Sequence, residues 1–241
     1  MALATTSAET GKLQDRAVVI HILTKSISAV LFDLDGTLIE THINFPAMTQ
    51  AMRRMAEEAG VEPHFVEGRD ILGIVEAVQN ELNRRGEDGE VFRRDAFAVL
   101  EEIEVEGCSQ PALLHGTVEC LMELRQRGVA VGIVTRNCSR VATSLLAQFN
   151  VPHAALLTRD DVRRAKPHPE HLHKALNRLG AVPEQAIMVG DHWMDIQAGK
   201  AAGCSVTVGI LGRQSAARFS PCPPDYLVRD LFELLTTLLS V

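Results

Sequence analysis

The hydrophobic residues of this chain follow two periodicities in two parts of the sequence. From position 29, the run AVLFDLD is a short apolar stretch that ends in acidic residues, which is typical of a buried parallel strand. Similar runs, separated by segments of helical spacing, recur after position 113, at 129–135, 154–157, 186–190, 204–209 and 226–228. Strands that alternate with helices predict an α/β fold with a Rossmann-like parallel sheet and helices on both faces.

Residues 40–113 instead repeat their apolar side chains at helical spacing. Three such stripes begin at Phe45, Ile71 and Val91, with breaks near 60–63 and 85–89. We therefore expect an all-helical insertion after the first strand. The predicted division is an N-terminal extension at 1–25, a core at 26–39 and 114–241, and a helical cap at 40–113.

Composition narrows the class of protein. With 241 residues, 46% of them hydrophobic and 23% charged, the chain is long enough to bury a core and close to the average soluble globular protein. The 24 Lys and Arg residues against 31 Asp and Glu residues give a net charge of −7, which provides no general attraction for nucleic acid or an anionic membrane. Five scattered cysteines without a CxxC pair indicate neither a disulfide framework nor a zinc site. We expect a soluble, cytoplasmic protein without a nucleic-acid or membrane partner.

Four polar clusters fall where predicted strands end or shortly afterwards. They are Asp33, Asp35 and Gly36; Thr135, Arg136 and Asn137; Lys166; and Asp191 with Asp195. In open α/β sheets, ligands bind beyond the carboxyl ends of the strands. We therefore expect these residues to share one site.

Taken together, the four clusters resemble the motifs of the haloacid dehalogenase (HAD) superfamily of phosphotransferases: DxDGT, a hydrophobic strand ending in Thr or Ser, a Lys, and GDxxxD. The resemblance covers about residues 27–240, with the motifs in the same order and on the same elements. The place of the helical insertion, between the first and second motifs, is similar to the C1 cap of the subfamily that contains phosphoglycolate phosphatases. The resemblance implies a phosphatase that hydrolyses small phosphomonoester metabolites through an aspartyl-phosphate.

The chemistry of phosphoryl transfer gives these carboxylates their expected roles. A carboxylate approaches a phosphate dianion only if a cation offsets the repulsion, and hard oxygen ligands suit Mg²⁺. We assign Asp33 as nucleophile and Mg²⁺ ligand and Asp191 as the second carboxylate ligand, and the resemblance adds the backbone carbonyl of Asp35. Asp195 is expected to hold a metal-bound water, to orient Lys166, or to bind the metal directly.

The remaining residues are expected to act on the phosphate and on the leaving group. Asp35 protonates the departing alcohol and then activates the water that hydrolyses the intermediate. Lys166 neutralises the phosphate and the nucleophile. Three neighbouring arginines leave the choice of this cation open: Arg159, Arg163 and Arg164. The predicted phosphate contacts also include Gly36, Thr135, Arg136 and Asn137, with a surface role equally open for Arg136.

The sequence also distinguishes between the phosphatase and other activities found in the superfamily that it resembles. Asp35 argues against dehalogenases, which lack the second aspartate of the first motif, and against P-type ATPases, which also have membrane spans. A sugar-phosphate mutase of the β-phosphoglucomutase type keeps all four motifs and a similar cap, so it stays the alternative. A non-catalytic binding module is disfavoured because Asp33 and Asp35 are intact. The natural substrate and the oligomeric state stay open.

Three histidines, His168, His171 and His173, follow Lys166 closely. Their spacing is neither HExxH nor that of a zinc finger. We therefore expect surface histidines near the mouth of the site rather than a metal site.

Overall fold

The computed structural model describes residues 27–238, and the predicted extension at 1–25 lies outside this range. The described strands are β1 (Ala29–Phe32), β2 (Ile39–Glu40), β3 (Ala112–Leu113), β4 (Ala130–Val134), β5 (Ala155–Leu157), β6 (Ala186–Gly190), β7 (Val206–Ile210) and β8 (Tyr226–Val228). The helices are α2 (Phe45–Glu58), α3 (Ile71–Arg84), α4 (Gly89–Gly107), α5 (Thr117–Gln126), α6 (Ser139–Gln148), α7 (Glu170–Leu179), α8 (Trp193–Ala202) and α9 (Leu231–Leu238). Short 3₁₀ helices cover Pro63–Phe65, Arg159–Asp161, Pro183–Gln185 and Ala216–Phe219.

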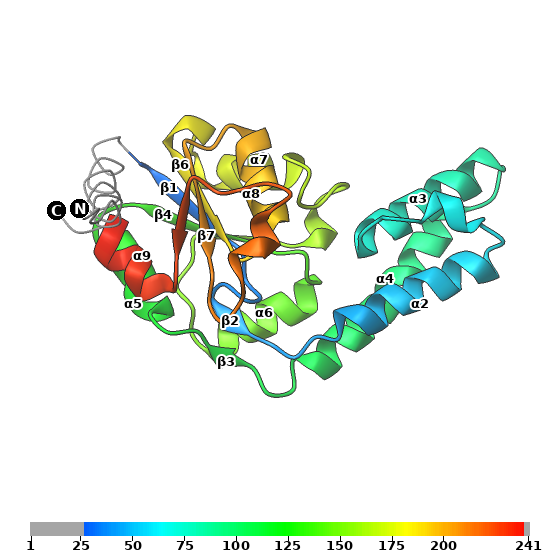
Figure 1. Ribbon diagram of the computed structural model, residues 1–241, viewed down its shortest axis with the longest axis horizontal. Helices are drawn as coiled ribbons and strands as arrows, with labels where there is room; N and C mark the ends of the chain where they lie inside the picture. The colour runs from blue at the N-terminus through cyan, green and yellow to red at the C-terminus, as the bar shows by residue number, and fades with distance from the viewer. Residues whose placement is uncertain (1–26, 239–241) are drawn as a thin grey trace, which may run out of the picture. The chain divides into compact units, whose positions relative to one another are not determined.

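Six of the described strands form one parallel sheet, in the order β5-β4-β1-β6-β7-β8 (Figure 1). The first strand, β1, lies in the middle, with its Phe32 opposite Ile133 of β4 on one side and Val189 of β6 on the other. All four residues of β1 are buried, as expected for a strand that is covered on both faces. The α/β fold with a Rossmann-like parallel sheet is therefore confirmed.

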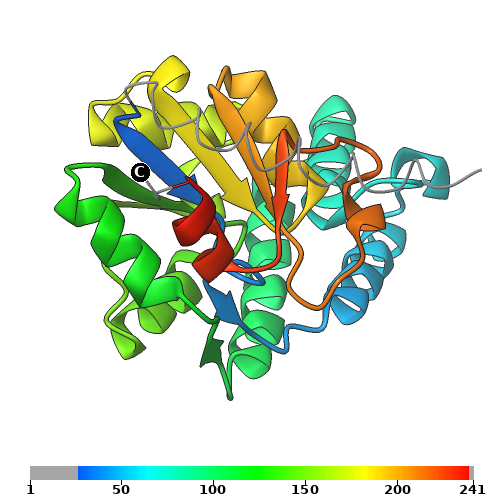
Figure 2. The same ribbon diagram turned by 60° about the vertical axis from the view of Figure 1, so that its left-hand side comes forward.

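Helices cover both faces of this sheet. α7 and α8 pack together on one face, and α5 and α9 pack together on the other (Figures 1 and 2). On the first face, Leu172 and Leu176 of α7 lie in one apolar cluster with Leu31 of β1 and Met188 of β6. Among the helices within residues 27–238, none combines the length and the apolar character needed to cross a membrane.

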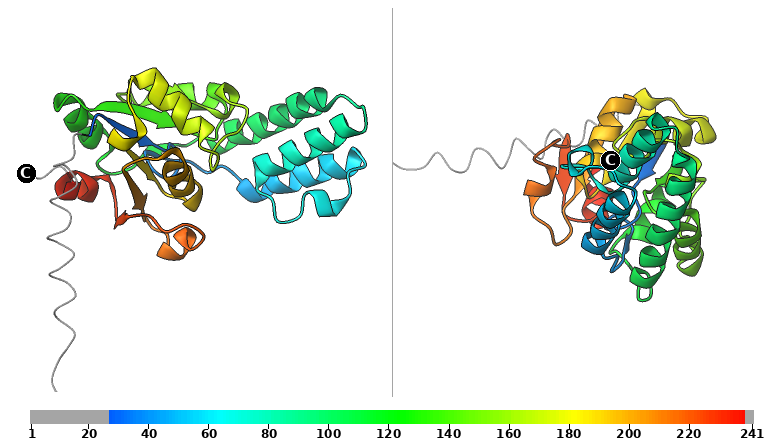
Figure 3. Two further views of the ribbon diagram at one scale, coloured as in Figure 1. Left: turned by 90° about the horizontal axis from the view of Figure 1, so that it is seen from above. Right: turned by 90° about the vertical axis from the view of Figure 1, so that its right-hand side faces the viewer.

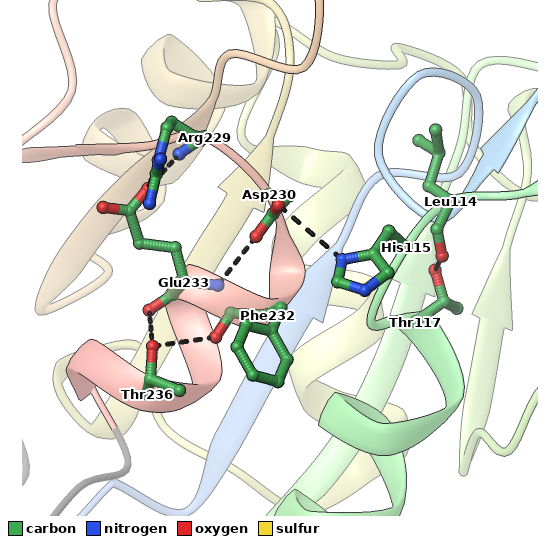
Figure 4. A network of polar contacts seen from close by, with 8 residues as sticks. All are labelled: Leu114, His115, Thr117, Arg229, Asp230, Phe232, Glu233 and Thr236. Atoms are coloured by element: carbon green, nitrogen blue, oxygen red, sulfur yellow. Dashed lines mark hydrogen bonds and ion pairs between the residues drawn. The ribbon is translucent and has the colours of Figure 1, made fainter.

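Polar contacts fix the start of α9 (Figure 4). Asp230 accepts a hydrogen bond from the Glu233 N–H, at 2.7 Å, and its other oxygen lies 3.7 Å from Nδ1 of His115 in the turn before α5. The His115 ring also lies beside the Phe232 ring, with centroids 5.5 Å apart. Glu233 accepts hydrogen bonds from the backbone N–H and the Nε of Arg229, at 2.7 and 2.9 Å. These contacts hold the beginning of α9 against the turn that precedes α5.

The chain forms two compact units. The first contains the large sheet, and the second contains residues 41–112 and 137–148. Within the second unit, α2, α3 and α4 pack side by side around an apolar core (Figure 3), to which α2 contributes Met48 and Met52. The helical character of the insertion agrees with its apolar spacing. Its predicted boundaries at 40 and 113 stay a prediction, because the second unit also contains α6.

Candidate active site

The register of the sheet brings two of the predicted clusters to one edge. Asp33 directly follows the last residue of β1, and Asp191 directly follows the last residue of β6. The Asp33 N–H donates to the carbonyl of Val189 on β6, with an N···O distance of 2.9 Å. Because β1 and β6 are parallel neighbours, both carboxylates emerge at the carboxyl end of the sheet, where open α/β sheets bind their ligands.

Lys166 lies between two aspartates. Its Nζ is 2.6 Å from Asp33 Oδ1 and 2.6 Å from Asp195 Oδ1, and its side chain is only 1% exposed. Burial disfavours the charged amine, but the two carboxylates outweigh burial and raise the pKa of Lys166 above its usual range. Lys166 is therefore a fixed positive charge beside Asp33. Of the neighbouring arginines, the buried Arg159 donates from Nη1 to the carbonyl of Arg136, at 3.3 Å.

Asp195 connects this lysine to the start of α8. Its Oδ1 contacts Lys166, while its Oδ2 accepts a hydrogen bond from the His192 N–H, at 3.1 Å, in a capping box. A Cβ at Gly190 would lie 2.4 Å from the Asp195 side chain, so the glycine makes room for this carboxylate. Of the three roles that the sequence left open for Asp195, the orientation of Lys166 has direct geometric support.

Three carboxylates gather around this point. Oxygen atoms of Asp33, Asp191 and Asp195 lie within 4.8 Å of one another. Burial raises the pKa of Asp33 to about 7 and that of Asp191 to about 8, and the neighbouring carboxylates add to both shifts. A divalent cation would offset this repulsion, and a cluster of hard oxygen donors fits Mg²⁺. The residues present therefore suit the predicted metal.

Gly36 lets the loop after β1 approach Asp191. Its φ of 81° lies in the left-handed region, and a Cβ there would be 2.4 Å from Asp191 Oδ2. The Gly36 N–H donates to the carbonyl of Ile39, at 2.8 Å, within the loop. The loop itself uses this amide, and the predicted contact of Gly36 with the phosphate stays a prediction. The absence of a side chain at Gly36 leaves room for the Asp191 carboxylate.

Four further residues were predicted for the site: Asp35, Thr135, Arg136 and Asn137. Asp35 lies near enough to Asp33 and Asp191 for its charge to raise the pKa of both. Thr135 follows β4 and is buried, and Arg136 contacts the sulfur of Met194 through Nη1. Asn137 is buried but belongs to the second unit. The phosphate contacts assigned to Thr135, Arg136 and Asn137 stay predictions.

Two residues of the site were not predicted. Arg218 Nη1 lies 2.6 Å from Asp191 Oδ2, and no sequence pattern indicates this ion pair. His171 is fully buried, and its Nδ1 accepts a hydrogen bond from the Lys166 N–H, at 3.3 Å. Burial, together with the Lys166 charge, lowers the pKa of His171 to about 3, so the ring is neutral. The expectation of a surface histidine is wrong for His171, because the ring lies on the buried face of α7 next to Leu172.

Residues 27–203 match the family of haloacid dehalogenase-like hydrolases. The match covers most of the chain, and the chain belongs to this family. Among individual proteins, it is similar to pyrophosphatase PpaX of Bacillus velezensis, with 32% identity over 227 residues that cover 88% of this chain and 96% of that protein. The family and the enzyme class predicted from the sequence, a HAD-like phosphatase, are therefore confirmed.

Solved structures agree on the fold. A predicted phosphoglycolate phosphatase from Haemophilus somnus 129pt is 20% identical with a TM-score of 0.59, covering 88% of this chain and 98% of that chain. A Thermotoga maritima protein assigned as a β-phosphoglucomutase is 22% identical with a TM-score of 0.58, covering 89% of this chain and 100% of that chain. At these identities the likeness shows the fold alone.

Proposed function

We propose that this chain is a Mg²⁺-dependent phosphatase that hydrolyses small phosphorylated compounds through a phosphorylated Asp33. The observation that carries the proposal is the 2.6 Å contact of Asp33 with the buried Lys166, next to Asp191 and Asp195 in reach of one cation. The family and the similarity to a pyrophosphatase support the phosphatase class. A cytoplasmic location accompanies this proposal.

The proposed first step is attack by Asp33 on phosphorus. A bond forms between a carboxylate oxygen and phosphorus while the bond from phosphorus to the leaving oxygen breaks. Lys166 holds the attacking carboxylate and offsets negative charge, which reduces its repulsion from the phosphate. A Mg²⁺ ion held by Asp33, Asp191 and the Asp35 carbonyl would supply the remaining charge neutralisation. Asp195, whose Oδ1 also lies 2.6 Å from Lys166 Nζ, holds this ammonium group beside Asp33.

The proposed role of Asp35 is proton transfer. As an acid it protonates the leaving alkoxide, and as a base it then activates the water that attacks the phosphorylated Asp33. Water attack releases phosphate and restores the free carboxylate. Asp35 lies in the loop directly after Asp33, in a bridge to Ile39, so a single short segment carries both the nucleophile and the acid.

The experiment that tests the proposed function is phosphate release with and without Mg²⁺. We expect the purified protein to hydrolyse p-nitrophenyl phosphate in the presence of Mg²⁺, to lose this activity in EDTA, and to recover it when excess Mg²⁺ is added. Hydrolysis that is unaffected by complete removal of divalent cations would contradict the proposed metal dependence. No hydrolysis of any phosphate ester or of pyrophosphate would contradict the phosphatase proposal.

Two substrate classes are compared in the same assay. The similarity to PpaX favours pyrophosphate as one substrate to test, and the predicted phosphomonoesters form the other class. The ratio of their kcat/KM values assigns the preferred class. The alternative is a sugar-phosphate mutase, and the Thermotoga maritima protein assigned as a β-phosphoglucomutase has the same fold. This alternative requires that a hexose phosphate is isomerised faster than phosphate is released.

The acid role of Asp35 predicts an effect that depends on the leaving group. With Asp35→Asn, we expect phosphoryl transfer from an alkyl phosphate to slow by about 10²–10⁴-fold, the usual range for general acid catalysis. Transfer from p-nitrophenyl phosphate should slow much less, because p-nitrophenolate leaves without much protonation. The measurement is a single-turnover rate for both esters, since the second, water-dependent step then does not limit the signal. Equal losses for both esters would refute the acid role.

A further inference from the structure

Arg218 makes a contact that the proposed mechanism does not use. Its Nη1 is 2.6 Å from Oδ2 of Asp191, the second carboxylate of the candidate metal site. The Arg218 side chain is 27% exposed and that of Asp191 is 13% exposed, so the ion pair is largely shielded from water. A charged hydrogen bond in such surroundings holds a carboxylate more firmly than a surface pair does.

The segment between β7 and β8 places Arg218 at this position. The next residue, Phe219, is 2% exposed and inserts beside Gly209 of β7, where a Cβ would lie 2.8 Å from the Phe219 ring. At the start of the segment, the Gly212 N–H donates to the carbonyl of Arg229, at 2.8 Å. Near its end, Lys200 Nζ contacts the carbonyl of Pro223, at 2.6 Å. The segment is therefore anchored on both sides of the arginine.

Asp191 is held from two directions. On one side, its Oδ2 contacts Arg218. On the other side, the carboxylate packs against Gly36, where an added Cβ would lie only 2.4 Å from Oδ2 and 3.3 Å from Oδ1. A carboxylate has a second oxygen, and a ligand carboxylate commonly gives one oxygen to the metal and the other to a hydrogen-bond donor. The contact with Arg218 therefore fixes the rotation of the carboxylate that the cation would meet.

We propose that Arg218 is a positioning residue that orients the Asp191 carboxylate for a divalent cation. The inference rests on the proposed function, and it assigns to the segment after β7 a part in metal affinity. Loss of such a partner usually weakens metal binding by about 10–100-fold. Arg218→Ala should therefore weaken Mg²⁺ binding even though it removes a positive charge from the neighbourhood of the site.

Charge alone predicts the opposite result. A positive side chain repels Mg²⁺, so a purely electrostatic role of Arg218 requires tighter binding when the charge is removed. Arg213 lies in the same segment, carries the same charge, is 89% exposed and lies 3.7 Å from Glu40. Arg213→Ala therefore controls for the loss of one positive charge. Arg218→Lys keeps the charge but lacks the planar pair of donors, so its affinity should fall between wild type and Arg218→Ala.

The experiment measures Mg²⁺ affinity without substrate. The only tryptophan of the chain, Trp193, begins α8 two residues after Asp191, so its emission reports on metal binding. Titration with Mg²⁺ alone, together with the Mg²⁺-dependent rise in Tm, gives Kd for wild type and the three variants. The Tm without Mg²⁺ shows whether each variant is folded, and if Arg218→Ala does not fold, the comparison is made with Arg218→Lys.

We expect a Kd about 10–100-fold higher for Arg218→Ala and a Kd within about twofold of wild type for Arg213→Ala. A Kd for Arg218→Ala equal to or below that of wild type would overturn the positioning role and leave the proposed function intact. Absence of Mg²⁺ binding to the wild type by both readouts would overturn the metal site itself, and with it this inference. The two failures are therefore distinct.

Discussion

Asp33→Asn is expected to abolish phosphatase activity, with kcat lower by a factor on the order of 10⁴ or more, as for nucleophile removal in other enzymes. The substitution keeps the shape of the side chain and its place after β1, but it removes the attacking charge and one carboxylate of the cluster. The measurement is Mg²⁺-dependent hydrolysis together with trapping of phosphate on the protein by acid quench. Turnover or trapped phosphate at wild-type levels would exclude Asp33 as the nucleophile.

The Tm of metal-free Asp33→Asn shows whether the substitution damages the folded structure. Burial, opposed by Lys166, raises the pKa of Asp33 from 3.8 to about 7, so the folded protein holds this proton to a higher pH than the unfolded chain does. The contribution of Asp33 to the stability of the metal-free protein is therefore lost as pH rises from about 4 to about 7. Asparagine does not ionise, so metal-free Asp33→Asn should have the higher Tm at pH 8 and the same Tm as wild type near pH 4. A lower Tm at pH 8 would instead attribute the lost activity to damaged structure.

Lys166→Met is expected to reduce both activity and stability. Methionine has a similar length but no charge, so Asp33 and Asp195 would face each other without the cation that now lies 2.6 Å from each. Removal of one partner from a buried ion pair costs about 3–5 kcal/mol. For a chain of this size we expect a fall in Tm of roughly 10 °C. The loss of an electrostatic partner of the reaction should lower kcat by about 10²–10³-fold.

Two further variants separate these effects. Arg125→Met removes one exposed positive charge near the end of α5, outside the site, and should leave both kcat and Tm near wild type. Lys166→Met combined with Asp195→Asn removes one of the two uncompensated carboxylates, so it should regain much of the Tm while activity stays low. If the double variant recovered activity, Lys166 would be a structural residue and not part of the reaction.

The strands and longer helices were predictable because their burial follows from local patterns. The apolar run at 186–190 is β6 itself, and the stripe that begins at Ile71 is α3. β2 and β3 have two residues each, too short for any periodicity, and they pair across the whole insertion. Their pairing is a contact between segments that the whole insertion separates in the sequence, and no local pattern encodes such a contact.

The residues of the site also divide into those that a local pattern predicts and those that depend on long-range packing. Asp33 and Asp191 could be placed together because parallel strand ends share one edge of the sheet. Arg218 could not, since one arginine in a short 3₁₀ helix follows no periodicity and its ion pair with Asp191 depends on the long-range packing of Phe219 beside Gly209. For His171 the signal was present, because its spacing from Ala175 places it on the apolar stripe of α7.

The central place of β1 affects how the chain folds during synthesis. β1 ends at Phe32, but its partners begin only at Ala130 and Ala186, after the whole helical insertion has been made. Because synthesis adds about 5–20 residues per second, this apolar strand stays without its second partner for on the order of 10 s. Unpaired strands of this kind are prone to aggregate, and charged residues beside them act as gatekeepers. Asp33 and Asp35 would thus protect the nascent chain before either takes part in chemistry.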